Sequence, residues 1–358
     1  MFAKIAVLGL GRVGRLAAEL LSDAGFDVVG FDARSIADAP FPVDVLDLRD
    51  AQASRTALAG QEAVLSCLPY AFNKDVASAA HALGLHYFDL TEDVGTTRHI
   101  RALAQSSRGI MAPQCGLAPG FVGVVGADLA ERFDRVRSIR LRVGALPQHP
   151  SGLLGYAFNW SPEGVVNEYL NDCEVIEEGV LKTVSAMEWL ETIYVGGVRL
   201  EAFTTSGGLG TMCETFAGRV ENLDYKSLRY PGHASMMNFF FHELLMREDR
   251  AAAGKILTNA KPPVDDDVVY VHVAAEGWKG GALGRREFVR AYYPAEIKGR
   301  ARTAIAWTTA ASVCAVIEMA RSGALPDKGF VKQETIPLER FLETGAGRLY
   351  AEHGRIGR

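Results

Sequence analysis

The sequence predicts an α/β fold in which a doubly wound parallel sheet is followed by a second domain of the α+β type, built on a mixed sheet. Two observations lead to this prediction. Up to Cys115, short apolar runs alternate with segments whose apolar residues recur at helical spacing. Beyond Pro119 the pattern changes to period-two alternation and to paired short runs around glycines. A chain of 358 residues has room for both domains, because one domain commonly holds about 100–200 residues.

The first part of the chain predicts a parallel sheet, because strands separated by helices are joined by right-handed crossovers. The first helix has its apolar residues between Val13 and Leu21, and two more helices are expected at Ala71–Leu83 and Ile100–Ser106. Six strands are expected, at Lys4–Leu8, Asp27–Phe31, Val43–Leu46, Ala63–Cys67, His86–Leu90 and Gly109–Ala112.

The middle of the chain predicts a mixed or antiparallel sheet with helices. A helix at Val122–Phe133 leads into a strand at Ser138–Val143, in which Arg140 and Arg142 alternate with apolar residues and predict one face in water. Two hairpins are expected, the second around a glycine-rich loop. Their strands are Ile193–Val195 with Val198–Thr204, and Val268–Ala275 with Glu287–Tyr293.

A long helix is expected at Thr303–Arg321, after a surface loop that includes Asp265–Asp267. No residue from Thr303 to Ile317 is charged. This stretch is nevertheless shorter than the ~20 apolar residues that a bilayer-spanning helix needs. We therefore expect a buried helix and no membrane partner.

The charge balance and the cysteines exclude several classes of protein. The chain has 38 basic and 43 acidic residues, a net charge of -5, whereas a sequence-independent nucleic-acid binder carries a basic excess. The five cysteines contain no Cys-x-x-Cys pair and the eight histidines are scattered, which argues against a disulfide framework and a zinc site. Because a strand pattern begins almost at once, no signal peptide is expected, and the prediction is a cytoplasmic protein.

A glycine-rich hexapeptide, Gly9 to Gly14, connects the first strand to the first helix and predicts a Rossmann-type dinucleotide site. Gly9 permits the tight turn, Gly11 lets a pyrophosphate approach the backbone, and Gly14 lets helix and strand pack closely. The free N–H groups at the helix start would face the phosphates. The alternative is an ordinary tight turn, which the full strand–turn–helix–strand context disfavours.

Asp32 ends the second strand and predicts the choice of dinucleotide. A carboxylate there accepts hydrogen bonds from the ribose hydroxyls of the adenosine and repels a 2′-phosphate, which favours NAD over NADP. Arg34 lies two residues further on and could accommodate a 2′-phosphate, which leaves NADP as an alternative.

Five segments beyond the glycine turn carry a family resemblance: Ser66–Tyr70, Tyr87–Leu90, Gln114–Gly120, Asn159–Pro162 and Leu228–His233. The third, a Cys-Gly-Leu-Ala-Pro-Gly exit from the first domain, and the fifth, with Arg-Tyr-Pro-Gly-His, are the most specific. In this order, which covers most of the chain, they resemble the saccharopine dehydrogenase family, including the lysine 6-dehydrogenases.

The resemblance implies both the domain organisation and the reaction. It implies a dinucleotide-binding domain of residues 1–119, joined by a returning C-terminal helix within 302–335, and a domain of residues 120–301 that binds substrate and dimerises. It implies that hydride moves from the terminal C–N carbon of L-lysine or saccharopine to the nicotinamide, giving 2-aminoadipate 6-semialdehyde. The expected dinucleotide contacts are Gly9, Gly11, Arg12, Val13, Gly14, Asp32, Asp47, Leu68 and Pro69.

Tyr70, Asp89 and Cys115 stand just past the carboxyl ends of the fourth, fifth and sixth strands, where open parallel sheets bind ligands. By resemblance they line the nicotinamide and substrate pocket, which makes them catalytic candidates. The alternatives are a half-buried aromatic, a helix N-cap and a small core residue. For Asp89 we favour function, because a carboxylate at that place is costly without a partner.

Hydride loss from a C–N carbon needs the neutral amine, so the site must accept a proton. Asp89, Tyr70 and His233 are the candidate bases, and His233 has the most suitable ordinary pKa. The alternative for His233 is a loop histidine that hydrogen-bonds the backbone after Gly232.

An amino-acid substrate also needs its carboxylate held. Arg229 is the candidate partner, because a guanidinium binds a carboxylate through two parallel hydrogen bonds. Tyr156 and Trp160 are candidate walls of the pocket. The alternatives are an ordinary inter-strand ion pair and an aromatic core.

Three functions therefore compete. The leading one is an NAD-dependent oxidoreductase acting on L-lysine or saccharopine. The second is reductive condensation of an amine with an aldehyde, as in the related carboxynorspermidine-forming enzymes. The third is a non-catalytic dinucleotide-binding protein. In each case we expect a homodimer that binds a small molecule and no nucleic acid.

Overall fold

The computed structural model describes residues 2–47 and 51–355, and it divides into two compact units. Unit 1 consists of the chain up to Val124 together with Ala306–Glu352. Unit 2 consists of Val125–Ile305 together with the residues from His353 onward. The division predicted from the sequence, at 119/120 and 301/302, lies a few residues before these boundaries.

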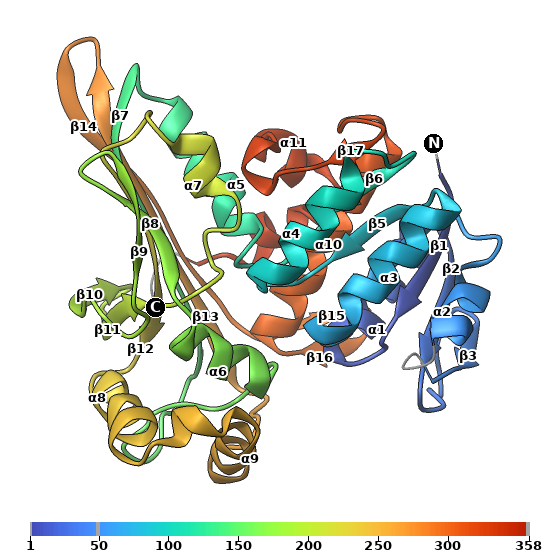
Figure 1. Ribbon diagram of the computed structural model, residues 1–358, viewed down its shortest axis with the longest axis horizontal. Coiled ribbons are helices and arrows are strands. Elements are labelled where there is room, and N and C mark those ends of the chain that lie inside the picture. Colours follow the sequence, from blue (N-terminus) through green and yellow to red (C-terminus); the bar gives the residue numbers. More distant parts are fainter. Residues whose placement is uncertain (1, 48–50, 356–358) are drawn as a thin grey trace. The chain divides into compact units, whose positions relative to one another are not determined.

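Unit 1 is built on a parallel sheet of seven strands (Figure 1). The strands are β1 (Lys4–Leu8), β2 (Asp27–Asp32), β3 (Val43–Val45), β4 (Ala63–Ser66), β5 (His86–Asp89), β6 (Ile110–Ala112) and β17 (Gly329–Phe330). They lie in the order β17-β6-β5-β4-β1-β2-β3, which confirms the predicted doubly wound sheet. The sequence analysis missed β17, because two residues are too few to give a pattern.

Helices cover this sheet in two layers (Figure 1). One layer contains α2 (Ala51–Leu58), α3 (Tyr70–Leu83) and α4 (Val94–Ala104), which pack side by side. The other contains α1 (Arg12–Asp23) and α10 (Ala304–Arg321), where the Cys314 thiol donates to the carbonyl of Ala17 at 3.5 Å. Unit 1 also contains η3 (Gln333–Thr335), α11 (Leu338–Glu343) and α12 (Arg348–His353), which ends one residue beyond it.

Helix α10 is the predicted long apolar helix. Its side chains at Trp307, Val313 and Cys314 are fully buried, which confirms that the apolar stretch belongs to a core. In the described part of the chain, no helix is both long enough and apolar enough to cross a membrane.

Unit 2 is built on a mixed sheet, as predicted. Its strands are β7 (Arg135–Pro147), β8 (Cys173–Glu177), β9 (Val180–Val184), β10 (Glu191–Val195), β11 (Val198–Thr204), β12 (Asn222–Arg229), β13 (Asp267–Lys279) and β14 (Ala282–Tyr292). The main path is β10-β11-β12-β7-β13-β14, with β12 and β7 parallel and the other neighbours antiparallel. The remaining elements are α5 (Phe121–Glu131), α6 (Pro162–Leu170), α7 (Met212–Phe216), α8 (His233–Asn238), η1 (Phe239–Glu243), η2 (Met246–Glu248), α9 (Arg250–Ala260), β15 (Ala295–Ile297) and β16 (Arg300–Arg302).

The structure confirms both predicted hairpins and shortens the loop of the second. Strands β10 and β11 join through Gly196 and Gly197, whose φ angles of 57° and 83° suit a two-residue turn. The predicted pairing of Val268–Ala275 with Glu287–Tyr293 is confirmed, but the glycine-containing loop between the strands is shorter than predicted. Strands β13 and β14 stay paired up to Lys279 and Ala282. Gly277 lies inside β13. A Cβ there would come within 2.5 Å of the Arg135 carbonyl oxygen, so this position of the strand requires glycine.

Two further expectations are wrong for the same reason: a charged side chain that was expected at the surface is buried together with groups that pair with it. Arg142 of β7 is 2% exposed instead of lying on a wet face, because its guanidinium pairs with Asp224 and Glu191. Asp267 does not belong to the surface loop. It is fully buried, and its carboxylate accepts hydrogen bonds from the N–H groups of Ala304 and Ile305.

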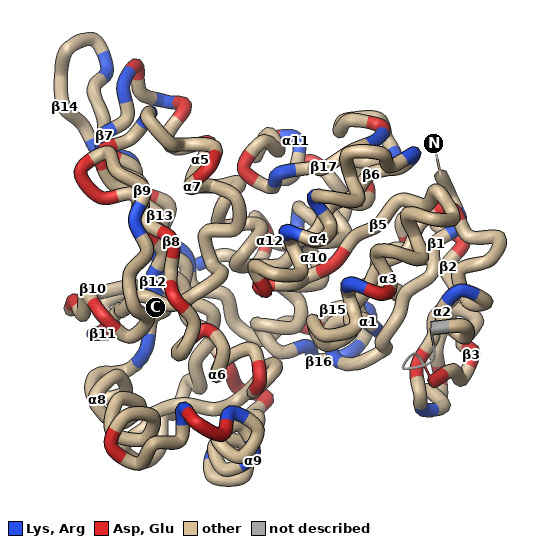
Figure 2. Tube along the Cα trace, viewed as in Figure 1, with Lys and Arg blue, Asp and Glu red and all other residues tan. Residues whose placement is uncertain are grey.

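The core of unit 2 lies under the half of its sheet that α6, α8 and α9 cover, and it is rich in aromatic side chains. Acidic and basic residues are interspersed along both units (Figure 2). The arginines of β7 illustrate this, since Arg137 lies 3.5 Å from Glu221 and Arg135 stacks on the ring of Trp278.

Candidate functional site

The glycine turn has the shape that a pyrophosphate requires. Gly9 has a φ of 85°, which disfavours any other residue. A Cβ at Gly14 would lie 1.9 Å from the Gly9 carbonyl oxygen, so helix α1 and strand β1 approach as closely as predicted. A Cβ at Gly11 would meet nothing within 4 Å. The space in front of Gly11 is therefore open to a phosphate group.

The start of α1 offers uncapped N–H groups to that space. Gly11 is its N-cap residue, no side chain caps the helix, and the first helical hydrogen bond runs from the Arg15 N–H to the Gly11 carbonyl. A helix N-terminus with free N–H groups favours an anion. These features fit a dinucleotide phosphate.

Asp32 lies at the carboxyl end of β2, beside the glycine turn. Its Oδ2 accepts a hydrogen bond of 2.8 Å from the Leu10 N–H, and its Oδ1 accepts one of 3.0 Å from the Arg34 N–H. The Arg34 guanidinium lies 3.8 Å from the same carboxylate and its side chain is 80% exposed. The carboxylate predicted to bind a ribose and the cation that could bind a 2′-phosphate thus stand side by side.

The other expected dinucleotide contacts lie on the same edge of the sheet. Leu68 is half-buried and lies against the turn, since a Cβ at Gly9 would come within 3.0 Å of Leu68 Cδ2. Pro69 is exposed and caps α3. Asp47 is exposed and follows β3. Arg12 is exposed and Val13 half-buried in the first turn of α1.

Asp89, at the end of β5, is fully buried and has three hydrogen-bond partners. Its Oδ2 accepts from the Tyr87 hydroxyl at 2.7 Å, and its Oδ1 accepts from the N–H groups of Thr91 and Gln114 at 3.0 Å each. Burial raises the pKa of Asp89 to about 6, against these hydrogen bonds. The argument that this carboxylate lacks a partner is therefore wrong. Asp89 braces the loops that follow β5 and β6.

Cys115 is fully buried beside Asp89. Its thiol donates to the carbonyl of Ala112 at 3.1 Å, and Gln333 Nε2 lies 3.3 Å from the sulfur. Burial raises the pKa of this thiol well above its ordinary value, and the negative charge of Asp89 raises it further. A thiol in this environment stays protonated, so its chemistry is that of a packing residue.

Tyr70 and Glu92, which also lie at this edge, keep accessible surface and carry groups that can exchange a proton. Tyr70, the first residue of α3, is half-buried. Glu92 follows β5 by three residues, is also half-buried, and was missed by the sequence analysis. Burial raises the pKa of Glu92 to about 7, with further contributions from the charges of Asp93 and Asp89. A carboxylate near this pKa can accept or release a proton at neutral pH.

In unit 2, Arg229 ends β12 as a buried cation. Arg229 is 3% exposed, and its guanidinium lies 4.6 Å from the centre of the Tyr156 ring. Nε donates to the Tyr169 hydroxyl at 2.6 Å and Nη1 to the Leu228 carbonyl at 2.8 Å. Within the described residues, no carboxylate forms an ion pair with Arg229 and its Nη2 makes no hydrogen bond. The predicted alternative, an inter-strand ion pair, is wrong.

His233 lies in the same cluster, 1% exposed. Its Nδ1 is 2.8 Å from the Leu154 carbonyl oxygen and its Nε2 is 3.0 Å from the Tyr169 hydroxyl. Burial, and then the charge of Arg229, lowers the pKa of His233 to about 3. The ordinary pKa that recommended His233 as a base therefore does not apply in the folded chain. Of its predicted alternative, the hydrogen bond to a backbone group is present, but His233 begins helix α8 instead of lying in a loop.

Tyr156 and Trp160 both belong to the aromatic cluster around Arg229. Tyr156 is 3% exposed. Trp160 is half-buried against the cluster, and its side chain interacts with the Tyr156 hydroxyl. A buried guanidinium that has no ion pair among the described residues is an arrangement that a bound carboxylate would complete.

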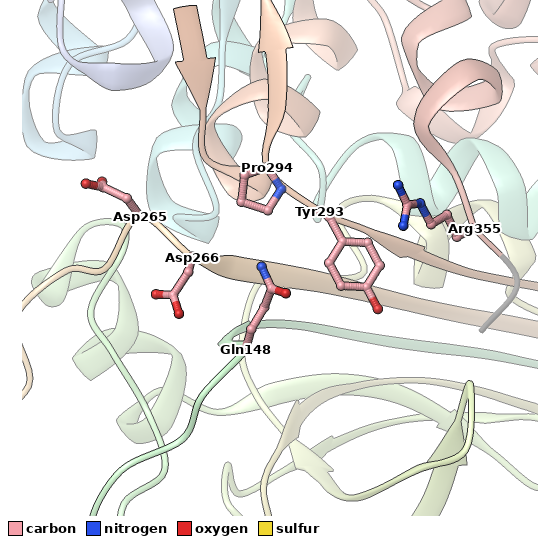
Figure 3. Close-up of a pocket in the computed structure, with 6 residues that line it drawn as sticks. All are labelled: Gln148, Asp265, Asp266, Tyr293, Pro294 and Arg355. Atoms are coloured by element: carbon pink, nitrogen blue, oxygen red, sulfur yellow. The ribbon is translucent and has the colours of Figure 1, made fainter. Parts of the chain in front are cut away.

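A surface pocket of about 770 Å³ lies elsewhere on unit 2 (Figure 3). It is lined by Gln148, Asp265, Asp266, Tyr293, Pro294 and Arg355. Its walls carry charges of both signs, and none of the predicted site residues lines it.

Comparison with family models gives two matches. A model described as the saccharopine dehydrogenase NADP binding domain matches residues 5–112. A model described as the saccharopine dehydrogenase C-terminal domain matches residues 116–352. The two models together cover nearly the whole described chain.

Curated relatives give a narrower match. Saccharopine dehydrogenase [NADP(+), L-glutamate-forming] of Schizosaccharomyces pombe is 23% identical over 202 residues, which are 52% of this chain and 45% of that protein. The enzyme of the same name from Saccharomyces cerevisiae is 27% identical over 160 residues, 41% of this chain and 34% of that protein. Each match spans less than half of the relative.

Solved structures show the same fold. The apo histidine-tagged saccharopine dehydrogenase (L-Glu forming) from Saccharomyces cerevisiae has a TM-score of 0.74 at 16% identity, with 99% of both chains covered. An engineered D-amino acid dehydrogenase bound to NADP+ has a TM-score of 0.51 at 13% identity, with 98% of this chain and 99% of that chain covered.

Proposed function

The chain belongs to the saccharopine dehydrogenase family, and on that premise we propose that it is a nicotinamide-dinucleotide-dependent oxidoreductase acting on the terminal C–N bond of L-lysine or a related amino acid such as saccharopine. The product is 2-aminoadipate 6-semialdehyde. The observation that carries this proposal is the buried, unpaired guanidinium of Arg229.

A buried charge without a counter-ion is costly, about 3–5 kcal/mol when one member of a buried pair is missing. Arg229 is buried and forms no ion pair within the described residues, although the charge of buried Glu168 acts on it from a distance. A substrate carboxylate would supply the counter-ion, receiving a hydrogen bond from Nη2. An amino acid provides this carboxylate, whereas a plain amine does not.

For the dinucleotide we propose NAD as the preferred form. The support is Asp32, whose carboxylate lies where a 2′-phosphate would be repelled. The names of the matched domain and of the curated relatives specify NADP. Arg34 is the residue of this chain that would hold a 2′-phosphate, so the preference is a balance between these two side chains.

The bound dinucleotide supplies the hydride acceptor, and the chain must supply the proton acceptor. The acceptor atoms of Asp89 and His233 are already engaged in hydrogen bonds inside the chain, and burial keeps the Cys115 thiol protonated. Glu92 and Tyr70 are half-buried at the carboxyl ends of the strands. We assign the proton acceptor to Glu92, because its pKa of about 7 lets it take the ammonium proton at neutral pH.

After hydride loss the substrate carbon carries an iminium, which water attacks to release ammonia from lysine or glutamate from saccharopine. Glu92, protonated in the first step, can return its proton to the departing nitrogen. Tyr70, the first residue of α3, lies at the same edge of the sheet, and we assign to it the orientation of the water.

A substrate panel tests this function. Purified protein is mixed with NAD or NADP and with L-lysine, L-saccharopine, L-ornithine or cadaverine, and the absorbance of the reduced nicotinamide is followed. We expect turnover of L-lysine or L-saccharopine and little turnover of cadaverine. Dinucleotide binding without turnover of any amino acid, in either direction of the reaction, would instead support a non-catalytic binding protein.

A further inference from the structure

A continuous chain of hydrogen bonds in unit 2 leads from a backbone carbonyl to Arg229. The Leu154 oxygen is 2.8 Å from His233 Nδ1, His233 Nε2 is 3.0 Å from the Tyr169 hydroxyl, and that hydroxyl is 2.6 Å from Arg229 Nε. The proposed chemistry uses Arg229 alone. His233 and Tyr169 are both nearly inaccessible, and both lie behind Arg229 in this chain of hydrogen bonds.

The direction of every hydrogen bond in this chain is determined. An Arg229 N–H can only donate, so the Tyr169 oxygen accepts. The Tyr169 hydroxyl then donates to His233 Nε2, which must carry no proton. His233 Nδ1 keeps its proton and donates it to the Leu154 carbonyl. A neutral histidine with the proton on Nδ1 is the one arrangement that satisfies all four groups, in line with its lowered pKa.

The guanidinium is thus anchored at three places. Nε is held by Tyr169, Nη1 by the Leu228 carbonyl, and the flat face by the ring of Tyr156. The His233 ring is itself packed parallel to Phe203, with a centroid distance of 6.3 Å and an angle of 7°. These contacts leave Nη2 as the nitrogen without a hydrogen bond inside the described chain.

We propose that His233 and Tyr169 are positioning residues that orient Arg229 so that Nη2 faces the carboxylate of the substrate. This inference rests on the proposed function and names how its carboxylate grip is built. It assigns His233 no proton transfer to substrate. The charged groups around His233 are Arg229 and Glu201, whose carboxylate accepts from the N–H groups of Gly232 and Ala234 on either side of the histidine.

Two substitutions of His233 separate positioning from general burial. His233→Gln places an amide oxygen near the position of Nε2 and still accepts from Tyr169. His233→Asn places an amide nitrogen near the position of Nδ1, donates to Leu154 and leaves Tyr169 without an acceptor. We expect the KM for the amino acid to rise at least about tenfold in His233→Asn and to stay within about threefold in His233→Gln. In both, kcat and the KM for the dinucleotide should change little.

Tyr169→Phe removes the central hydroxyl and should raise the same KM at least about tenfold. Tyr225→Phe is the matched control, because Tyr225 is buried in the same unit and its hydroxyl pairs with Ser227. The pH profile of kcat/KM should be unchanged in His233→Gln. Loss of its acid limb in that variant would show that His233 is a base and would overturn the proposal.

A binding measurement separates this proposal from the proposed function. L-Norleucine has the α-carboxylate of lysine and no terminal nitrogen, so calorimetry with the reduced dinucleotide present reports the carboxylate grip without turnover. We expect wild-type-like affinity in His233→Gln and Tyr225→Phe and at least about tenfold weaker binding in His233→Asn and Tyr169→Phe. Binding of this pattern without turnover of lysine would refute the reaction and keep the grip. Equal affinity in all variants, or no binding by the wild type, would refute the grip.

Discussion

The carboxylate of Asp32 accepts a hydrogen bond of 2.8 Å from the backbone N–H of Leu10, in the middle of the glycine turn. This contact joins the end of β2 to the loop after β1. Asp32 therefore shapes the glycine turn, in addition to the ribose contact that we propose for it.

Replacement of Asp32 by Ser should weaken NAD binding about tenfold and relax the discrimination against NADP, because the ribose acceptor and the negative charge are both lost. Fluorescence titration of both dinucleotides measures the two dissociation constants. Arg34→Ala is the matched control and should weaken NADP alone. A wild type that binds NADP more tightly than NAD would contradict the cofactor preference proposed for this chain.

Gly11→Val should weaken dinucleotide binding without unfolding unit 1. The open space at Gly11 accepts the side chain, and its φ of -67° is compatible with any residue. The methyl groups would then occupy the path of the pyrophosphate, and affinity should fall by at least about tenfold, or about 1.4 kcal/mol. Gly254→Ala, in α9 of unit 2, serves as the control for helix substitution. A folded Gly11→Val variant with wild-type affinity would rule out this turn as the phosphate site.

Glu92→Gln should lower kcat by about 10²-fold, the usual scale for a positioned proton acceptor. The wild-type rate should rise with pH through an apparent pKa near 7, because the acceptor must be ionised, and this limb should vanish in the variant. Asp89→Asn is the matched control and should keep kcat within a few-fold. If Asp89→Asn loses the rate and Glu92→Gln does not, the two carboxylates have the opposite roles.

Asp89→Asn should also change the pH dependence of stability. The folded pKa of about 6 lies above the ordinary 3.8, so wild-type Asp89 contributes stability at low pH that is lost as the pH rises through 6. The amide that replaces the carboxylate keeps an oxygen for the N–H groups of Thr91 and Gln114 and has no charge to bury. Denaturant unfolding should show that the free energy of unfolding of the variant, relative to that of the wild type, increases by about 3 kcal/mol from acid to neutral pH. A pH-independent difference would contradict the assigned burial of this charge.

The fold of unit 1 follows largely from local patterns. Each residue of β4, from Ala63 to Ser66, is buried, so the strand appears in the sequence as an apolar run between turn residues. The turn at Gly9–Gly14 and the place of Asp32 follow from spacing alone. In unit 2 the glycines of the sequence predict a loop, but Gly277 and Gly284 lie inside β13 and β14 and are paired with each other.

The site was less predictable, because its central contacts join residues that are distant in the sequence. Tyr169 hydrogen-bonds Arg229 and His233, 60 and 64 residues away, and within its own helix it occupies the position of an ordinary apolar residue. The partners of Asp89 include the backbone N–H of Gln114, and a backbone contact of this kind cannot be predicted from the residue type. Glu92 lies among the acidic residues of a loop, and only its burial distinguishes it from solvated ones.

The central claim is that Arg229 holds the carboxylate of a lysine-type substrate, and the most direct test compares L-lysine with cadaverine, which lacks only that carboxylate. The measurement is kcat/KM for both compounds with the wild type and with Arg229→Lys, whose ammonium cannot form the two parallel hydrogen bonds. We predict that the wild type prefers L-lysine at least about 100-fold and that Arg229→Lys loses at least about tenfold on L-lysine through KM while its rate on cadaverine is unchanged. Equal losses on both compounds, or no wild-type preference for L-lysine, would contradict the account.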